Sequence, residues 1–246
     1  MTTTELLSGA RSAGRVGATV RTVRTLTRFL LLQASWYLAI VLVLAVAAIA
    51  VMIALVDEPS VSVVQFGRQS AVWYPFAIAA TLHAVFLPAH VAVGMTRASF
   101  VRGALLAALV MAVLYSAVFT GAMALEAAVY DAAGWQHRIT DGAWFTRDPG
   151  DLGAVAIAQL VSVMAAHCGG YLVAATYHRV GGWWGTALLP LTAGPVLGVV
   201  GLLSQWVDAD LIAPGLRLAL AVLATAALAA AFAALARRFA MKPTGG

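Results

Sequence analysis

The stretch that decides the fold is FLLLQASWYLAIVLVLAVAAIAVMIALV, residues 29–56, an apolar run without a single charged residue. The hydrocarbon core of a bilayer is roughly 30 Å thick, and about 20 helical residues cross it. The run also exceeds the roughly 7–15 apolar residues of a signal-peptide core. It therefore predicts a transmembrane helix that stays in the mature protein as an anchor.

The rest of the chain is also rich in hydrophobic residues and poor in charged ones. Of 246 residues, 62% are hydrophobic and 10% are charged, with a mean hydropathy of +0.91, whereas soluble domains carry about 25% charged residues. The composition predicts an all-α integral membrane protein with six transmembrane helices, forming one domain over residues 29–237 between a segment at 1–28 and a tail at 238–246. The other five apolar runs are 71–93, 104–129, 153–177, 183–207 and 216–235.

The cationic residues predict the orientation. With both termini in the cytoplasm, eleven of the fifteen Lys and Arg residues fall on the inner side, as the positive-inside rule requires. These are Arg11, Arg15, Arg21, Arg24, Arg28, Arg97, Arg102, Arg179, Arg237, Arg238 and Lys242, against Arg68, Arg138, Arg147 and Arg217 outside. We expect a multi-pass protein of the bacterial inner membrane, and the basic pI of about 9.9 needs no nucleic-acid partner.

The basic segment before the first run, RSAGRVGATVRTVRTLTRFLL (residues 11–31), has helical periodicity. Arg21, Arg24 and Arg28 fall on one face at 100° per residue. This pattern favours a separate amphipathic helix on the cytoplasmic membrane surface, in contact with membrane lipids. The alternative is that the arginines only mark the inner side.

Several kinds of chemistry are excluded. The only lysine is Lys242, in the tail, so no G-x-x-x-x-G-K-[ST] phosphate-binding loop can exist in this chain. The only cysteine is Cys168, which excludes an internal disulfide and a cysteine-based metal site. We therefore predict neither an enzyme nor a metal centre.

A few polar residues within the apolar runs are candidates for function. Histidines 83, 90, 167 and 178 could form two columns of haem ligands, or could be hydrogen-bonded or interfacial. Glu126, at the end of the third run, has either a packing role or a role in gating or substrate binding. Gln159, in the fourth run, is a second candidate for gating or substrate binding.

Two further segments have open interpretations. Residues 130–152, YDAAGWQHRITDGAWFTRDPGDL, form either a small cap over the external face or a loop whose aromatic residues rest on the membrane interface. The fifth run contains Pro190 and Pro195, which predict a bent crossing, and Gly194 with Gly198, which form a possible helix-packing face.

The segment VAVGMTRASFVRGALL, residues 91–106, carries a more specific pattern, G-x-T-R-x-x-F-x-x-G, at Gly94, Thr96, Arg97, Phe100 and Gly103. The segment lies between the second and third of six predicted crossings. It resembles the segment that follows the second helix of ABC-2 type permeases, the membrane subunits of bacterial ABC exporters. Glu126 followed by Gly134-Trp135, and CGGYLVAATYHRVGGWWG at residues 168–185, resemble later parts of the same family. The sequence departs from the family pattern at His90 and Ala98.

The resemblance implies that the turn between the second and third helices is a coupling helix that docks on a separate ATPase subunit. The contact residues would be Gly94, Met95, Thr96, Arg97, Ala98, Ser99, Phe100 and Arg102. It also implies a pair of permeases, either two copies of this chain or this chain and a related one, with two ATPase subunits that bind ATP and Mg. The permease chain itself would need no cofactor. The main alternative is a histidine-ligated haem protein of the membrane.

Overall fold

The computed structural model describes residues 3–55, 60–140, 148, 150–204 and 212–237, with side chains from Val16 onward. The elements are α1 (Thr3–Leu55), η1 (Val64–Phe66), α2 (Gly67–Ala92), α3 (Arg97–Ala132), α4 (Leu152–Ala187), α5 (Leu189–Thr192), α6 (Gly194–Leu202) and α7 (Pro214–Arg237). Within these residues, five helices are long and apolar enough to cross a membrane, and the apolar segment Leu189–Leu202 is shorter. The chain is thus an all-helical protein with a multi-pass membrane character.

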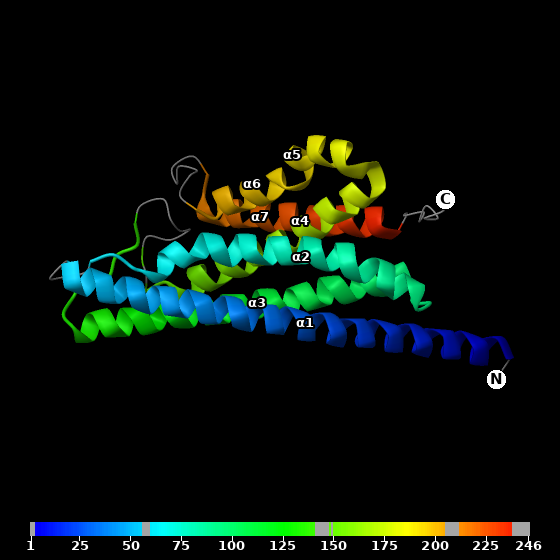
Figure 1. The fold of residues 1–246 in the computed structure, drawn as a ribbon, viewed down its shortest axis with the longest axis horizontal. Helices are drawn as coiled ribbons and strands as arrows, with labels where there is room; N and C mark the ends of the chain where they lie inside the picture. The colour runs from blue at the N-terminus through cyan, green and yellow to red at the C-terminus, as the bar shows by residue number, and fades with distance from the viewer. Residues whose placement is uncertain (1–2, 56–59, 141–147, 149, 205–211, 238–246) are drawn as a thin grey trace.

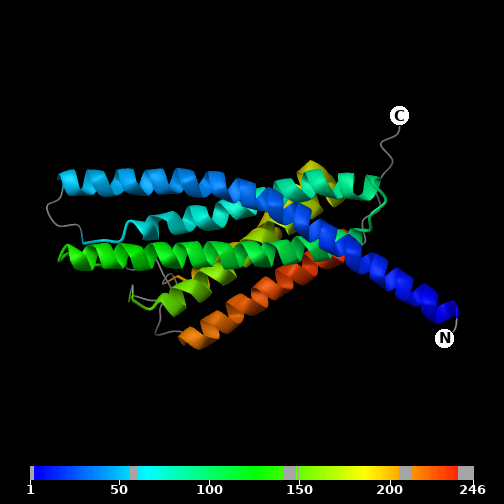
Figure 2. The same ribbon diagram turned by 90° about the horizontal axis from the view of Figure 1, so that it is seen from below.

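The first helix differs from expectation, because α1 is one continuous helix of 53 residues. The predicted division into a surface helix and a separate first crossing at Phe29 is therefore wrong. The physical reason lies in the sequence, since neither glycine nor proline occurs between Ala18 and Leu55 to break the backbone hydrogen bonds. Figures 1 and 2 show the first turns of α1 extending past the rest of the bundle.

Helix α4 lies at the centre and packs against α2, α3 and α7. Two adjacent glycines make this close packing possible. A Cβ atom on Gly170 would collide with the backbone oxygen of Phe76 in α2, and one on Gly169 would collide with the side chain of Val196 in α6. Small residues allow helix backbones to approach in this way.

The chain reverses direction inside α4, at Gly181, whose φ of 82° is a left-handed conformation that glycine adopts readily. The hydroxyl groups of Tyr177 and Thr186 lie 2.9 Å apart. Nine residues of continuous helix would separate these positions by roughly 13 Å, so the segment after Gly181 folds back on α4. The predicted internal loop HRVGG contains this reversal.

The returning segment is broken, as the prolines predict. Pro190 and Pro195 each stand in the first turn of a short helix, α5 and α6, and the two helices are separated at Ala193. A methyl group added to Gly194 or Gly198 would meet no neighbour within 4 Å. Within the described residues, helices therefore pack closely at Gly169 and Gly170 and not at Gly194 and Gly198.

The arrangement of the ends is clear in Figure 1. Helix α1 begins and α7 ends at the same end of the bundle, and the turn between α2 and α3 lies there too. The opposite end holds η1, the end of α3 and the start of α4. The two groups of candidate residues from the sequence thus lie at different ends.

Candidate functional site

The turn between α2 and α3 is short and well defined. Gly94 has φ of 80°, in the left-handed region that favours glycine. The backbone N–H of Met95 donates to the carbonyl of His90 over 3.1 Å and closes the end of α2. Gly94 thus allows the chain to turn out of α2.

Thr96 is the N-cap of α3, and its hydroxyl accepts a hydrogen bond from the N–H of Ser99 over 3.2 Å. The Ser99 hydroxyl in turn donates to the Thr96 carbonyl over 2.6 Å and lies 3.0 Å from Nε2 of His90. His90, where the family pattern has a different residue, therefore connects the last turn of α2 to the first turn of α3.

Phe100 does not face outward. Its side chain is fully buried, and its ring meets the rings of His83 and His90 edge-to-face at 5.8 and 5.5 Å. The expectation that Phe100 anchors a partner subunit is therefore wrong. The cause is helical spacing, because the residue that follows the N-cap by four positions points into the bundle along with Gly103.

Gly103 is buried at the crossing of α1 and α3. A Cβ atom at this position would lie 2.5 Å from Cγ2 of Thr22 and 3.4 Å from the backbone nitrogen of Val23. The glycine that ends the motif thus allows the closest approach between these two helices.

The remaining motif residues differ in exposure. Gly94, Thr96 and Arg102 are exposed, Met95, Arg97 and Ala98 are half-buried, and Ser99 is buried. Arg97 opens α3 itself, so the region predicted as a separate coupling helix is the first turn of a long helix. Only part of the predicted contact set is therefore accessible to another protein.

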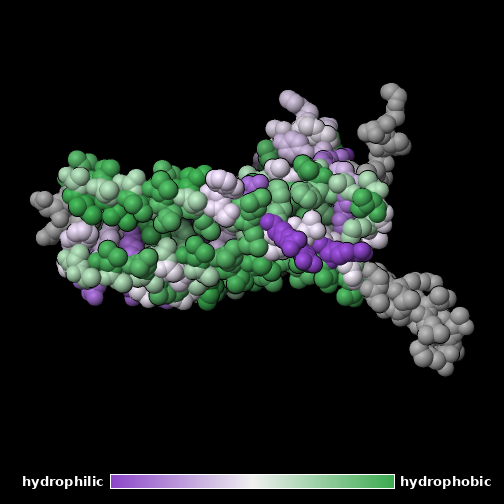
Figure 3. Space-filling view, turned by 60° about the horizontal axis from the view of Figure 1, so that its bottom comes forward, coloured by the Kyte–Doolittle hydropathy of each residue, from purple (hydrophilic) through white to green (hydrophobic). Residues whose placement is uncertain are grey.

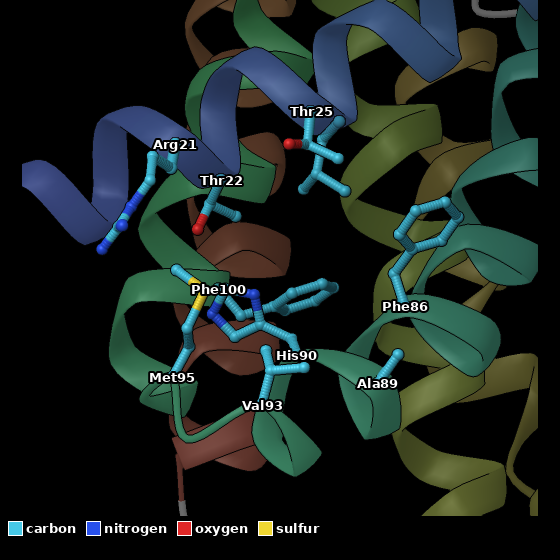
Figure 4. Close-up of a pocket in the computed structure, with 10 residues that line it drawn as sticks. Arg21, Thr22, Thr25, Phe86, Ala89, His90, Val93, Met95 and Phe100 are labelled. Atoms are coloured by element: carbon cyan, nitrogen blue, oxygen red, sulfur yellow. The ribbon is translucent and has the colours of Figure 1, made fainter.

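A pocket of about 260 Å³ lies behind this turn, between α1 and the end of α2. Figure 4 shows its walls, with His90 and Phe100 between the two helices. The pocket is mostly apolar, and Arg21 of α1 is also part of its lining. Its other lining residues are Thr22, Thr25, Leu26, Phe86, Ala89, Val93 and Met95.

Glu126 lies near the other end of α3, where roughly 40 Å of helix separates it from the turn. Its side chain is 3% exposed. One carboxylate oxygen accepts from the N–H groups of Val63 at 2.6 Å and Val64 at 3.2 Å, and the other accepts from the hydroxyl of Ser62 at 2.5 Å. Nε2 of His137 lies 3.1 Å from that second oxygen. These contacts favour the packing role for Glu126 over the gating role.

The segment around His137 covers this cluster. The N–H of Ser62 donates to the carbonyl of Arg138 over 2.9 Å, and the N–H of Thr140 donates to Oε1 of Gln65 over 2.8 Å. The described part of the connection, residues 133–140, thus pairs with the segment before α2, as the cap interpretation requires. Of the three aromatic residues of the alternative, Trp135 packs edge-to-face on Tyr130 at 5.7 Å, and Trp144 and Phe145 lie outside the described residues.

Gln159 is fully buried in α4. Within the described residues, neither atom of its amide has a hydrogen-bond partner. A buried amide without a partner is unfavourable by roughly 1–3 kcal/mol, so Gln159 stays a candidate for contact with a bound molecule.

The four histidines of the haem hypothesis are in contact with protein groups. The ring of His83 lies 5.6 Å from that of His178 and 5.5 Å from that of Phe232, and Nδ1 of His167 lies 2.9 Å from the carbonyl of Val163. Phe100 occupies the space beside both His83 and His90. His90 and His167 are thus hydrogen-bonded, whereas Nδ1 of the buried His83 has no hydrogen-bond partner among the described residues.

Two buried arginines have a role that the sequence analysis missed. Arg68 and Arg217, each 2% exposed, donate to the carbonyls of Leu203 and Ser204 at 2.9 and 3.3 Å. These carbonyls lie at the end of α6, where a helix dipole favours cations. Both arginines stand at the starts of apolar runs, and this position is compatible with burial. The count of cationic residues on each side of the membrane used them only to assign the outer side.

No protein-family profile, curated protein or solved structure matches this chain.

Proposed function

We propose that this chain is the permease subunit of a bacterial ABC exporter of the ABC-2 type, which crosses the inner membrane six times with both termini in the cytoplasm. Two features of the fold support six crossings. Helix α1 begins and α7 ends at the same end of the bundle (Figure 1), and the segment after Gly181 returns along α4 through α5 and α6. Both features favour an even number of crossings.

The observation that carries the proposal is the surface of the α2–α3 turn. The turn exposes Gly94, Thr96 and Arg102, and a largely apolar pocket of about 260 Å³ lies directly behind it. An apolar side chain seated in a pocket, with charged pairs around it, is the usual composition of a binding hot spot. A partner ATPase subunit could insert such a side chain and pair a carboxylate with Arg102.

The residues packed behind the turn would transmit a movement of the turn to the neighbouring helices. A partner that pushes on the turn would move the first turn of α3, whose Phe100 and Gly103 are packed against α2 and α1. ATP and Mg, bound by the partner subunit, would drive closure of the two ATPases. The two permeases of the pair would then shift between inward-facing and outward-facing states, according to which state the closed ATPases bind better.

The two arginines of this segment differ in exposure. Arg97 is half-buried, so its substitution alters the packing of α3 as well as any docking. Arg102 is exposed, so Arg102→Glu reverses a charge on the surface alone. We expect Arg102→Glu to lower stimulation of the ATPase subunit while the chain still inserts in the membrane.

The decisive experiment is co-purification. Tagged chain, expressed with its native operon, is expected to retain a subunit with a nucleotide-binding P-loop. Ala89→Trp, which fills the pocket, is expected to release that subunit, whereas Ala92→Trp, at an exposed position outside the pocket, is expected to retain it. Absence of any P-loop subunit from the wild-type preparation would end the permease proposal.

A further inference from the structure

A groove runs along one side of the contact between α1 and α3. Its volume is about 490 Å³, within the roughly 300–1,000 Å³ that is usual for small-molecule sites. Helix α1 contributes residues three or four positions apart, all on one face, and α3 contributes two residues one turn apart. They are Thr19, Val20, Val23, Arg24, Thr27 and Arg28 from α1, and Leu106 and Val110 from α3.

The groove lies beside a close contact of the two helices. A Cβ atom on Gly103 would lie 2.5 Å from Cγ2 of Thr22, and Figure 2 shows α1 crossing α3 obliquely. The exposed Leu106 and Val110 of α3 therefore face the space next to α1 and are not covered by it.

The level of the groove follows from the charges of the two helices. Arg28 is the last charged residue of α1, and Arg102 is the last charged residue of α3 before Glu126. Since the helices run in the same direction and touch at Thr22 and Gly103, the uncharged stretch of α3 begins at this contact, and that of α1 begins roughly 9 Å beyond it. The groove lies along this interval, where lipid headgroups are expected to meet the hydrocarbon core.

The rim of the groove is cationic. Arg24 and Arg28 are exposed and lie one helical turn apart, and within the described part of the chain no carboxylate forms an ion pair with either of them. Figure 3 shows a group of hydrophilic side chains beside largely apolar surface on one face of the molecule. The hydroxyl of Thr27, which lines the groove, has no hydrogen-bond partner among the described residues.

From these features we propose that the groove binds one anionic diacyl phospholipid of the surrounding leaflet. The guanidinium groups of Arg24 and Arg28 bind the headgroup phosphate, for which the forked donors of arginine are well suited. One acyl chain lies against Leu106 and Val110, roughly 5 and 10 Å deeper along α3 than Gly103.

This site would fix the angle between α1 and α3, because the lipid fills the space where they diverge. The inference does not depend on the permease proposal, since it rests on the α1–α3 groove and not on the α2–α3 turn. A chain that binds no ATPase would still bind the lipid.

The test is native mass spectrometry of the full chain in detergent micelles, titrated with dioleoylphosphatidylglycerol or dioleoylphosphatidylcholine. Two cations near an anionic headgroup are expected to favour the anionic lipid by about 30-fold. The double variant Arg24→Gln/Arg28→Gln is expected to remove this preference. Its matched control, Arg179→Gln/Arg237→Gln, removes two exposed charges outside the groove and is expected to keep it.

The apolar part of the site has its own variants. Leu106→Trp fills the groove and is expected to reduce binding of both lipids, whereas Leu109→Trp, at an exposed position of α3 outside the groove, is expected to reduce neither. Circular dichroism checks that each variant keeps its helices.

Four results would overturn the inference. The two lipids could bind equally to the wild-type chain, or the control double variant could lose the preference as fully as the groove variant does. Leu109→Trp could reduce binding as much as Leu106→Trp. Finally, excess inorganic phosphate could displace the phosphatidylglycerol, which would make the groove a simple anion site.

Discussion

Gly103 of α3 lies directly against Thr22 of α1, so close that a methyl group on the glycine would come within 2.5 Å of Cγ2 of the threonine. This contact joins the helix that follows the α2–α3 turn to the long first helix. It also sets the crossing that opens the groove beside it. The pocket behind the turn and the groove therefore share one structural origin.

Gly103→Ala tests this contact. Alanine usually stabilises a helix interior by about 1 kcal/mol relative to glycine, but overpacking at a closed contact is unfavourable by about 1–3 kcal/mol. We expect a lower melting temperature in detergent micelles. Gly121→Ala, on the same helix with no neighbour within 4 Å, is the matched control and is expected to raise it. Equal shifts in both variants would mean that α1 does not pack at Gly103.

Glu126→Ala tests the polar cluster at the other end of α3. Removal of the carboxylate leaves several buried donors without an acceptor, including Ser62 and the N–H of Val63. We expect a loss of about 2–4 kcal/mol in the free energy of unfolding. Asp131→Asn, at an exposed position one turn beyond, is expected to change little. A loss of transport at unchanged stability would instead favour the gating role for Glu126.

Gly170→Ala tests the packing at the centre of the bundle. The added methyl group would meet the backbone oxygen of Phe76, which cannot rotate away as a side chain can. We expect destabilisation at or beyond the upper end of the usual 1–3 kcal/mol, about 3 kcal/mol or more. Gly198→Ala, where a methyl group meets nothing, is the control for thermal unfolding. Similar melting temperatures for the two variants would contradict the observed contact of α2 and α4.

Gln159→Leu separates stability from function. Because the buried amide has no partner among the described residues, an apolar side chain of similar size is expected to stabilise the fold by about 1–3 kcal/mol. Gln69→Leu, at an exposed position, is the control. If Gln159 contacts a transported molecule, export falls although the melting temperature rises. A lower melting temperature would show that the amide is paired after all.

Much of the local structure followed from the sequence. The apolar runs lie in the observed helices, Thr96 caps α3, and the reversal occurs in the predicted loop at Gly181. These features depend on neighbours in the chain, on apolar length, side-chain capping and the freedom of glycine. The continuity of α1 was harder to predict from the sequence. The periodicity of Arg21, Arg24 and Arg28 fits both a separate surface helix and the first turns of a helix that crosses the membrane.

What the sequence by itself determined is the membrane character, the helical class and the positions of most turns, because a bilayer and the backbone set those requirements one segment at a time. Only the tertiary structure decided which side of each helix is covered. It turned Phe100 inward, buried Arg68 and Arg217 against the end of α6, and engaged Glu126 with Ser62 and His137. Those outcomes depend on which helices become neighbours, and in a chain that is apolar on almost every side, hydrophobic periodicity carries little information about that choice.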